Sequence, residues 1–242
     1  MKRLIPALLM VLLAAVAVEA QTVVASTAWT AAFARLAGAE TVVSIAPAEM
    51  THPAEYEITP KDILRIREAD FFVCAGYEVM MKALTDSGAV AEPKVIRITT
   101  QNDWNTVETQ VRAIASRLGT GPKAERNLAA LKSVYDAGIT LFSGPDYASK
   151  RLVVHTFQMP VLKMLGLAVA GTFGPAPLSP KEIADLSATK ADIIVDNIHN
   201  PVALPLSRLL PGARYVQFLN CPGLKGTASL EDVFSFNVKA LK

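Results

Sequence analysis

The sequence predicts an α/β protein of two lobes, each with a mostly parallel sheet flanked by helices, joined by a long linking helix. Short runs of β-branched residues alternate with helical patterns along most of the chain, as is typical of parallel sheets. One long helical stretch, residues 106–142, divides this alternation into two blocks. The chain has 242 residues. After removal of an N-terminal signal, the remaining part is long enough for two lobes of roughly 100 residues each.

The first block is expected to begin with a strand shortly after residue 20. Its clearest helix start is Thr59, a favourable N-cap residue that is followed by Pro60 at the first helical position. The expected strands are residues 22–26, 41–45, 71–74 and 95–98, and the expected helices are residues 29–38, 59–68 and 79–84.

The segment Gly119-Thr120-Gly121-Pro122 breaks the long helical stretch, and Pro122 can open its second helix. In the second block the expected strands are residues 152–155, 168–173, 193–196 and 215–219, and the expected helices are residues 159–165, 180–186, 205–210 and 230–241. The patterns together predict a signal peptide at 1–20, an N-terminal α/β lobe at 21–120, a linking helix at 121–145 and a C-terminal α/β lobe at 146–242.

The N-terminus has the three parts of a secretory signal. Lys2 and Arg3 give a positive start, residues 4–18 are almost all apolar, and Val18-Glu19-Ala20 offers small residues before a cleavage site. A transmembrane helix needs roughly 20 apolar residues, so a cleaved signal is favoured over an uncleaved anchor. No cysteine lies near the cleavage site. The mature protein is therefore expected to be periplasmic or secreted, without a lipid anchor.

Charge and cysteine content narrow the class of protein further. Lys and Arg number 24 and Asp and Glu 22, without a basic cluster, so a nucleic-acid partner is not indicated. Cys74 and Cys221 are too few for a disulfide scaffold. They could pair in an oxidising compartment, but we expect two buried, unpaired thiols.

The chain has only three histidines, His52, His155 and His199, and each lies at or beyond the carboxyl end of an expected strand. Ligands bind at this edge in open parallel sheets. Because neutral imidazole is a common zinc ligand, this placement indicates a metal site. The alternative is that each histidine, taken alone, is a solvated or structural residue.

A fourth ligand would close a tetrahedral site of the kind that captures an ion. Glu78 follows the expected strand at 71–74 and is the first choice, while the alternatives are Glu55, Glu57, Asp103, Asp196 and the thiol of Cys221. The predicted metal ligands are therefore His52, Glu78, His155 and His199. Three nitrogens and one oxygen favour Zn²⁺, with Mn²⁺ as the alternative.

Five segments occur in an order that resembles one protein family. They are residues 52–63 (HPAEYEITPKDI), 69–78 (ADFFVCAGYE), 155–157 (HTF), 178–183 (LSPKEI) and 229–237 (SLEDVFSFN). In this order they are similar to segments of the periplasmic zinc- and manganese-binding solute receptors of bacterial metal ABC transporters. The resemblance spans nearly the whole mature chain. It implies an ion held between two lobes joined by a rigid helix, and delivery of that ion to a membrane permease.

The ligand positions of that family are only partly retained. His155 lies squarely on one of them. Ala54 stands where the family has its first histidine, Asn102 where it has the second, and Asn220 near its late aspartate. We infer a rearranged site in which the other two histidines make up for the lost positions.

The sequence thus predicts a monomeric extracytoplasmic solute-binding protein, not an enzyme, that captures a divalent metal ion and delivers it to an ABC permease. One alternative is a secreted zinc-dependent hydrolase with Glu55 or Glu78 as its general base. The sequence contains no His-Glu-x-x-His motif in its support. The other alternative is a receptor of the same fold that has lost metal binding and takes another small solute.

Overall fold

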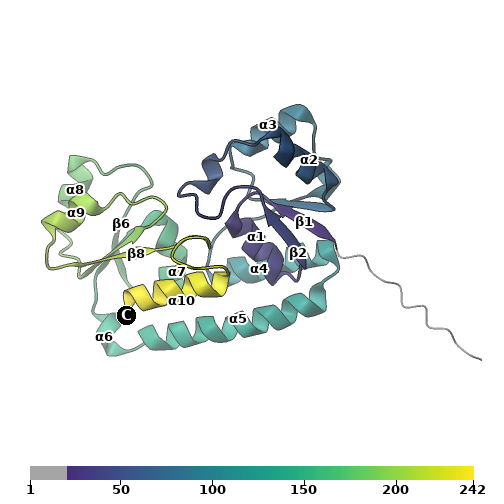
Figure 1. Cartoon of the computed structure of the whole chain (residues 1–242). Coiled ribbons are helices and arrows are strands. Elements are labelled where there is room, and N and C mark those ends of the chain that lie inside the picture. The colour runs from purple at the N-terminus through teal and green to yellow at the C-terminus, as the bar shows by residue number, and fades with distance from the viewer. Residues whose placement is uncertain (1–20) are drawn as a thin grey trace, which may run out of the picture.

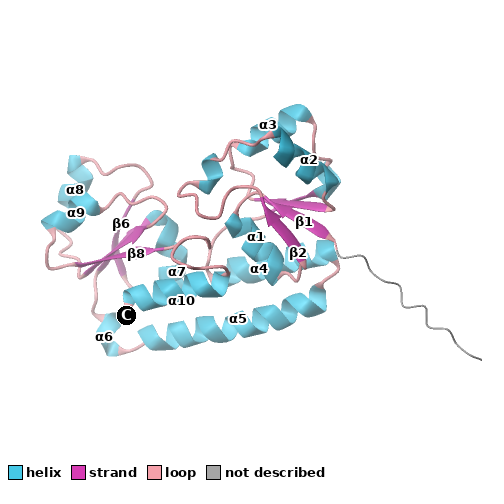
Figure 2. Cartoon of the chain, viewed as in Figure 1, coloured by secondary structure: helices cyan, strands magenta, loops and turns pink. Residues whose placement is uncertain are grey.

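The computed structural model describes residues 21–242 and contains two sheets in separate lobes (Figures 1 and 2). Each sheet has four parallel strands with helices on both faces, which confirms the predicted fold class. Helix α5 (Gly121–Phe142) runs below both lobes in the view of Figure 1. The expected signal peptide at 1–20 lies outside the described residues.

The sheet of the first lobe has the strand order β2-β1-β3-β4. Its register places Val24 beside both Val43 and Phe72. Its strands are β1 (Thr22–Ala25), β2 (Thr41–Ser44), β3 (Phe71–Cys74) and β4 (Val95–Arg97), and its helices are α1 (Ala28–Leu36), α2 (Pro60–Glu68), α3 (Met80–Ser87) and α4 (Trp104–Leu118), with 3₁₀ turns at Pro53–Glu55 and Glu92–Lys94. Helices α1 and α4 pack on one face of the sheet, and α2 and α3 pack on the other.

The sheet of the second lobe has the corresponding order β6-β5-β7-β8. Its strands are β5 (Leu152–His155), β6 (Val169–Phe173), β7 (Ile193–Asn197) and β8 (Arg214–Phe218). Its helices are α6 (Pro145–Ala148), α7 (Met159–Met164), α8 (Pro180–Ser187), α9 (Leu204–Leu209) and α10 (Leu230–Leu241), with a 3₁₀ turn at Thr156–Gln158. Helices α7 and α10 cover one face, and α8 and α9 cover the other.

Local sequence signals start and stop the helices as expected. The side chain of Thr59 accepts a hydrogen bond from the backbone nitrogen of Asp62, and the Asp62 carboxylate accepts one from the backbone nitrogen of Thr59, which makes a capping box with Pro60 inside it. Gly119 adopts the left-handed conformation that ends α4. The predicted break in the long helical stretch is therefore confirmed, with α5 starting two residues later.

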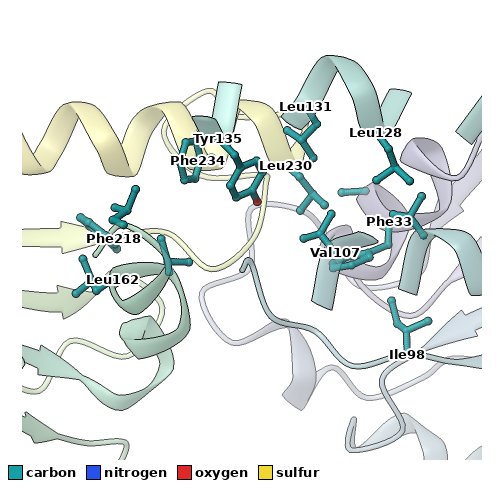
Figure 3. Packing of buried hydrophobic residues seen from close by; sticks show 14 of the residues in the cluster. Phe33, Ile98, Val107, Leu128, Leu131, Tyr135, Leu162, Phe218, Leu230 and Phe234 are labelled. Carbon is teal, nitrogen blue, oxygen red and sulfur yellow. The ribbon is translucent and has the colours of Figure 1, made fainter. Parts of the chain in front are cut away.

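One apolar cluster continues from lobe to lobe through α4, α5 and α10 (Figure 3). Phe33 and Val107 belong to its first-lobe part, and Leu162 and Phe218 to its second-lobe part. Between them, the ring of Tyr135 on α5 stacks on that of Phe234 on α10, with centroids 4.1 Å apart. Because this cluster is continuous, lobe separation would expose apolar surface to water.

Cys74 and Cys221 are buried and unpaired, in agreement with the prediction of two buried thiols. In the described part of the chain, no helix has both the length and the apolar character needed to cross a bilayer.

The contact between α5 and α10 generates a first prediction. A Cβ added at Gly138 would lie 2.7 Å from the Phe234 ring, so Gly138→Ala forces this ring or the helix that carries it to shift. We expect it to lower the free energy of unfolding by about 1–3 kcal/mol, as overpacked core substitutions do. Denaturant unfolding followed by circular dichroism measures the change.

Gly121→Ala is the matched control, because nothing lies within 4 Å of the added methyl group. It should leave the stability unchanged or raise it by up to about 1 kcal/mol. Equal stability of the two variants would show that α10 packs more loosely on α5 than the contact between Gly138 and Phe234 indicates.

Candidate metal site between the lobes

The loops that leave the carboxyl ends of the two sheets meet between the lobes. Asn102, beyond β4, donates from Nδ2 to the backbone oxygen of Asn220, beyond β8, at 2.7 Å. Gly223 lies against Ala48 of the loop after β2, so closely that an added Cβ would be 1.9 Å from the Ala48 carbonyl oxygen. Gly223 also has φ of +118°, a conformation that favours glycine. This is the edge at which the sequence predicts a ligand site.

His199 and Cys221 form a buried pair at this edge. His199 sits in the turn after β7, where its backbone nitrogen donates to the side chain of Asn197 at 2.8 Å. Its Nε2 lies 3.2 Å from the Cys221 Sγ, and its Nδ1 has no hydrogen-bond partner in the described residues. The two residues are 7% and 3% exposed, so solvent does not replace the missing partner.

Burial keeps both members of this pair neutral. It lowers the pKa of His199 to about 4, with a smaller contribution from the positive charge of His52. It also raises the pKa of Cys221 to about 12. Since His52 belongs to the first lobe and His199 to the second, the electrostatic coupling of the two histidines acts across the interface.

His155 ends β5 and is fully buried. Its Nδ1 accepts a hydrogen bond from the backbone nitrogen of Phe157 at 3.2 Å, so the neutral ring carries its hydrogen on Nε2. Nε2 has no partner in the described residues and faces Gly174, where an added Cβ would lie 2.6 Å away. Burial lowers the pKa of His155, and the charge of Asp196 opposes this effect. In this orientation the ring has no free lone pair for a metal ion.

Glu78 is anchored inside the first lobe. Its Oε1 accepts hydrogen bonds from the Ser26 hydroxyl at 2.5 Å and from the backbone nitrogen of Ala75 at 2.8 Å. Its Oε2 accepts one hydrogen bond, from the backbone nitrogen of Gly76 at 2.7 Å. The carboxylate therefore joins the ends of β1 and β3, and only Oε2 keeps capacity for a further strong partner.

The other carboxylates considered as ligands lie in different surroundings. Asp196 is fully buried and accepts hydrogen bonds from the Tyr215 hydroxyl at 2.8 Å and from three backbone nitrogens between residues 197 and 203. Asp103 caps α4 by accepting from the backbone nitrogen of Thr106 at 3.1 Å. Glu55 is exposed on its 3₁₀ turn. Asp196 and Asp103 thus hold local structure together, which leaves Glu55 without such a role.

A chain of buried polar groups also crosses the interface. Asn102 Oδ1 accepts from Trp29 Nε1 at 3.0 Å, and its backbone oxygen accepts from the Tyr135 hydroxyl at 2.9 Å. On the other side, Gln158 Nε2 donates to Asn220 Oδ1 at 2.5 Å. Sequence reasoning noticed the two asparagines as departures from a family pattern, but it missed Gln158 and Trp29. Their positions along the chain carry no signal of this contact.

The four predicted ligands thus lie in different local environments. His199 contacts Cys221 and is coupled to His52, while Glu78 and His155 make their hydrogen bonds separately. Within residues 21–242, no group of three or more His, Cys, Asp or Glu side chains is assembled to hold a metal ion. The complete ligand set therefore stays a prediction.

Comparison with known proteins adds information on the fold. No family model and no curated protein match the sequence. Among solved structures, the solute-binding protein FpvC of Pseudomonas aeruginosa in complex with Mn²⁺ has a TM-score of 0.73 and 19% identity, covering 92% of this chain and 97% of that chain. A Mn-bound periplasmic metal-binding protein of Candidatus Liberibacter asiaticus has a TM-score of 0.72 and 14% identity, covering 91% and 98%.

This chain has the fold of periplasmic metal-binding proteins. A further structure of FpvC holds Ni²⁺, with a TM-score of 0.70 at 18% identity, over 91% of this chain and 94% of that chain. The coverage of both chains means that the shared fold includes both lobes and the helices between them.

The amide contacts across the interface generate a second prediction. Asn102→Ala removes the partners of Trp29 Nε1 and of the Asn220 carbonyl oxygen. An unsatisfied buried polar group costs about 1–3 kcal/mol, so we expect a loss of about 2–4 kcal/mol in the free energy of unfolding. Denaturant unfolding measures this loss.

Asn105→Ala is the control, since Asn105 is exposed in the first turn of α4 and should change stability by less than about 0.5 kcal/mol. If Asn102→Ala were as stable as this control, the amide chain would contribute nothing to the joining of the lobes.

Proposed function

We propose that this protein is an extracytoplasmic solute-binding protein that captures a divalent metal ion between its lobes, Zn²⁺ first and Mn²⁺ as the alternative. The ion is then delivered to the membrane permease of an ABC transporter. In this proposal the protein is a monomeric carrier and not an enzyme. The fold supports it, because solved proteins of the same fold are described as metal-binding and carry Mn²⁺, Ni²⁺ or Cd²⁺.

The observation that carries the proposal is the state of His199. It is a buried imidazole at the meeting point of the lobes, with one nitrogen against a thiol and the other without a partner. Its pKa of about 4 makes it neutral at pH 7, so no proton has to leave before a ring nitrogen binds a metal ion. A surface histidine with a normal pKa of about 6.5 would still be partly protonated at pH 7.

The remaining ligands are proposed to join His199 when the ion enters. His52 approaches from the first lobe, where it is exposed at the start of the 3₁₀ turn and free to reorient. Glu78 can add its Oε2, whereas His155 must give up the hydrogen bond from Phe157 before Nδ1 can bind a metal. Metal capture in this arrangement orders side chains from both lobes around one ion.

Extracytoplasmic location rests on the pattern of residues 1–20, which has the positive start, apolar run and small-residue site of a secretory signal. Capture outside the cytoplasm is consistent with delivery to a permease. Affinity should fall in acid, because a protonated imidazole cannot bind a metal ion.

A second candidate is a receptor of the same fold that takes a small organic solute instead of a metal ion. The specific observation in its favour is the amide chain through Asn102, Asn220 and Gln158, which fills part of the interface with hydrogen-bonding groups rather than with metal ligands. Amides bind polar organic groups and are poor ligands for Zn²⁺.

Metal analysis of protein purified without a histidine tag, followed by calorimetric titration with Zn²⁺ and Mn²⁺, separates these candidates. Stoichiometric binding without hydrolysis of esters or peptides supports metal capture. Hydrolytic activity that depends on zinc would support a secreted hydrolase. Absence of binding for both ions would reject metal capture and leave the organic solute.

The cross-lobe position of His52 generates a third prediction. His52→Ala should weaken Zn²⁺ binding at least tenfold, because it removes the imidazole donor that the first lobe supplies. The melting temperature without metal should stay the same, since the side chain is exposed.

Glu49→Ala serves as the control, as it removes an exposed carboxylate from the same loop. Calorimetry should give it the wild-type affinity. A His52→Ala protein with wild-type Zn²⁺ affinity would exclude His52 from the site.

A further inference from the structure

We propose that Cys221 binds the captured ion as a thiolate, together with His199, and that the ion therefore belongs to the thiophilic divalent class of Zn²⁺ and Cd²⁺ rather than to the class of Mn²⁺. This inference rests on the proposed function and specifies its ligand set and its ion. It goes beyond the predicted ligands, in which a carboxylate was the first choice for the fourth position.

The geometry of the pair is close to that of a metal site. A tetrahedral zinc ion with normal bonds to an imidazole nitrogen and a thiolate sulfur holds these atoms about 3.5 Å apart. His199 Nε2 and Cys221 Sγ are 3.2 Å apart, so insertion of the ion requires only a small separation of the two side chains. When Nε2 binds the ion, the neutral ring carries its hydrogen on Nδ1, the nitrogen that has no partner in the described residues.

The location of the pair favours a site shared by the two lobes. Cys221 follows β8 in the loop that also contains Gly223, and Gly223 lies against Ala48 of the first lobe. That same first-lobe loop continues to His52, whose charge acts on His199. Two potential metal donors, His199 and Cys221, are thus already in contact in the second lobe. The charge of a third, His52 in the first lobe, acts on His199.

The binding step is a proton-for-metal exchange. The S–H bond of Cys221 breaks, its electron pair forms the sulfur–metal bond, and the proton leaves to solvent. No electron is transferred, so no oxidant or reductant is needed. A bound divalent cation deprotonates a coordinating thiol outright, so the neutral state of the buried thiol does not prevent coordination.

The donor set determines which ions bind well. Soft thiolate suits Zn²⁺ and Cd²⁺, and imidazole suits Zn²⁺ as well, whereas Mn²⁺ prefers oxygen ligands. Among the buried carboxylates that would favour Mn²⁺, Asp196 accepts four hydrogen bonds and Glu78 three, so only Oε2 of Glu78 keeps capacity for a metal ion. Selection for a thiophilic ion therefore follows from the imidazole and thiol that are already in contact at the site.

The alternative to a metal-binding role is that Cys221 is a buried thiol that only packs in the core, as many free cysteines do. The chain contains a matched example in Cys74, which is 0% exposed in β3 and has no histidine in hydrogen-bond contact. A comparison of Cys221→Ser with Cys74→Ser therefore separates loss of a ligand from loss of a buried thiol.

Co²⁺ is the probe, because a thiolate ligand gives it an intense charge-transfer absorption in the near ultraviolet. Reduced wild-type protein titrated with Co²⁺ should show this absorption, and Cys74→Ser should retain it. Cys221→Ser should lose it and bind Zn²⁺ at least tenfold more weakly, with little change for Mn²⁺. The ¹¹³Cd resonance of wild-type protein loaded with Cd²⁺ should carry the downfield shift of a thiolate ligand, which tests the idea without any substitution.

The outcomes distinguish this inference from the function on which it rests. Co²⁺ or Zn²⁺ binding without a thiolate signal in the wild-type protein overturns the role of Cys221 and leaves metal capture in place. Equal Zn²⁺ affinity of Cys221→Ser and Cys74→Ser overturns it as well. Binding of Mn²⁺ without binding of Co²⁺, Zn²⁺ or Cd²⁺ also overturns the inference and leaves metal capture in place, whereas absence of binding for all four ions rejects the proposed function together with the inference.

Discussion

The packing of Tyr135 between the lobes is the interaction on which the rest of the structure depends. Its ring stacks on Phe234 of the second lobe, and its hydroxyl donates to the backbone oxygen of Asn102 in the first. One side chain of α5 therefore joins the apolar cluster to the polar interface. Burial raises its pKa far above the usual range for tyrosine, so it stays a neutral donor. The position of one sheet edge against the other follows from this contact and its neighbours.

Burial at that edge has opposite consequences for different side chains. It keeps His199 and Cys221 neutral, which prepares an imidazole for metal binding and leaves a thiol that only a cation would ionise. The buried carboxylates Glu78 and Asp196 instead receive hydrogen bonds that hold turns and strand ends in place. The chemistry available to a ligand is therefore that of nitrogen and sulfur more than that of oxygen.

Much of the fold could be predicted from the sequence because its signals are local. The capping box that begins at Thr59 and the left-handed Gly119 act within a few residues, and their helices begin and end close to the expected places. The strand exits at His155 and His199 were also identified, since strand periodicity is a local property. The short helix α6 and the 3₁₀ turns were not predicted, because so few residues give no periodicity.

The candidate site was predictable only as far as the sheet edge on which each residue lies. Which atoms face each other there depends on side-chain rotamers and on contacts between segments far apart in sequence. His155 turns its Nδ1 to Phe157 although it ends a strand at the expected edge, and His199 turns its Nε2 to Cys221. The sequence by itself determined the two parallel sheets, the helix between them and the edge where polar residues gather, because local periodicity and capping encode these. Only the tertiary structure decided which donors are free and which are already bonded, since that depends on packing between lobes that no local pattern records.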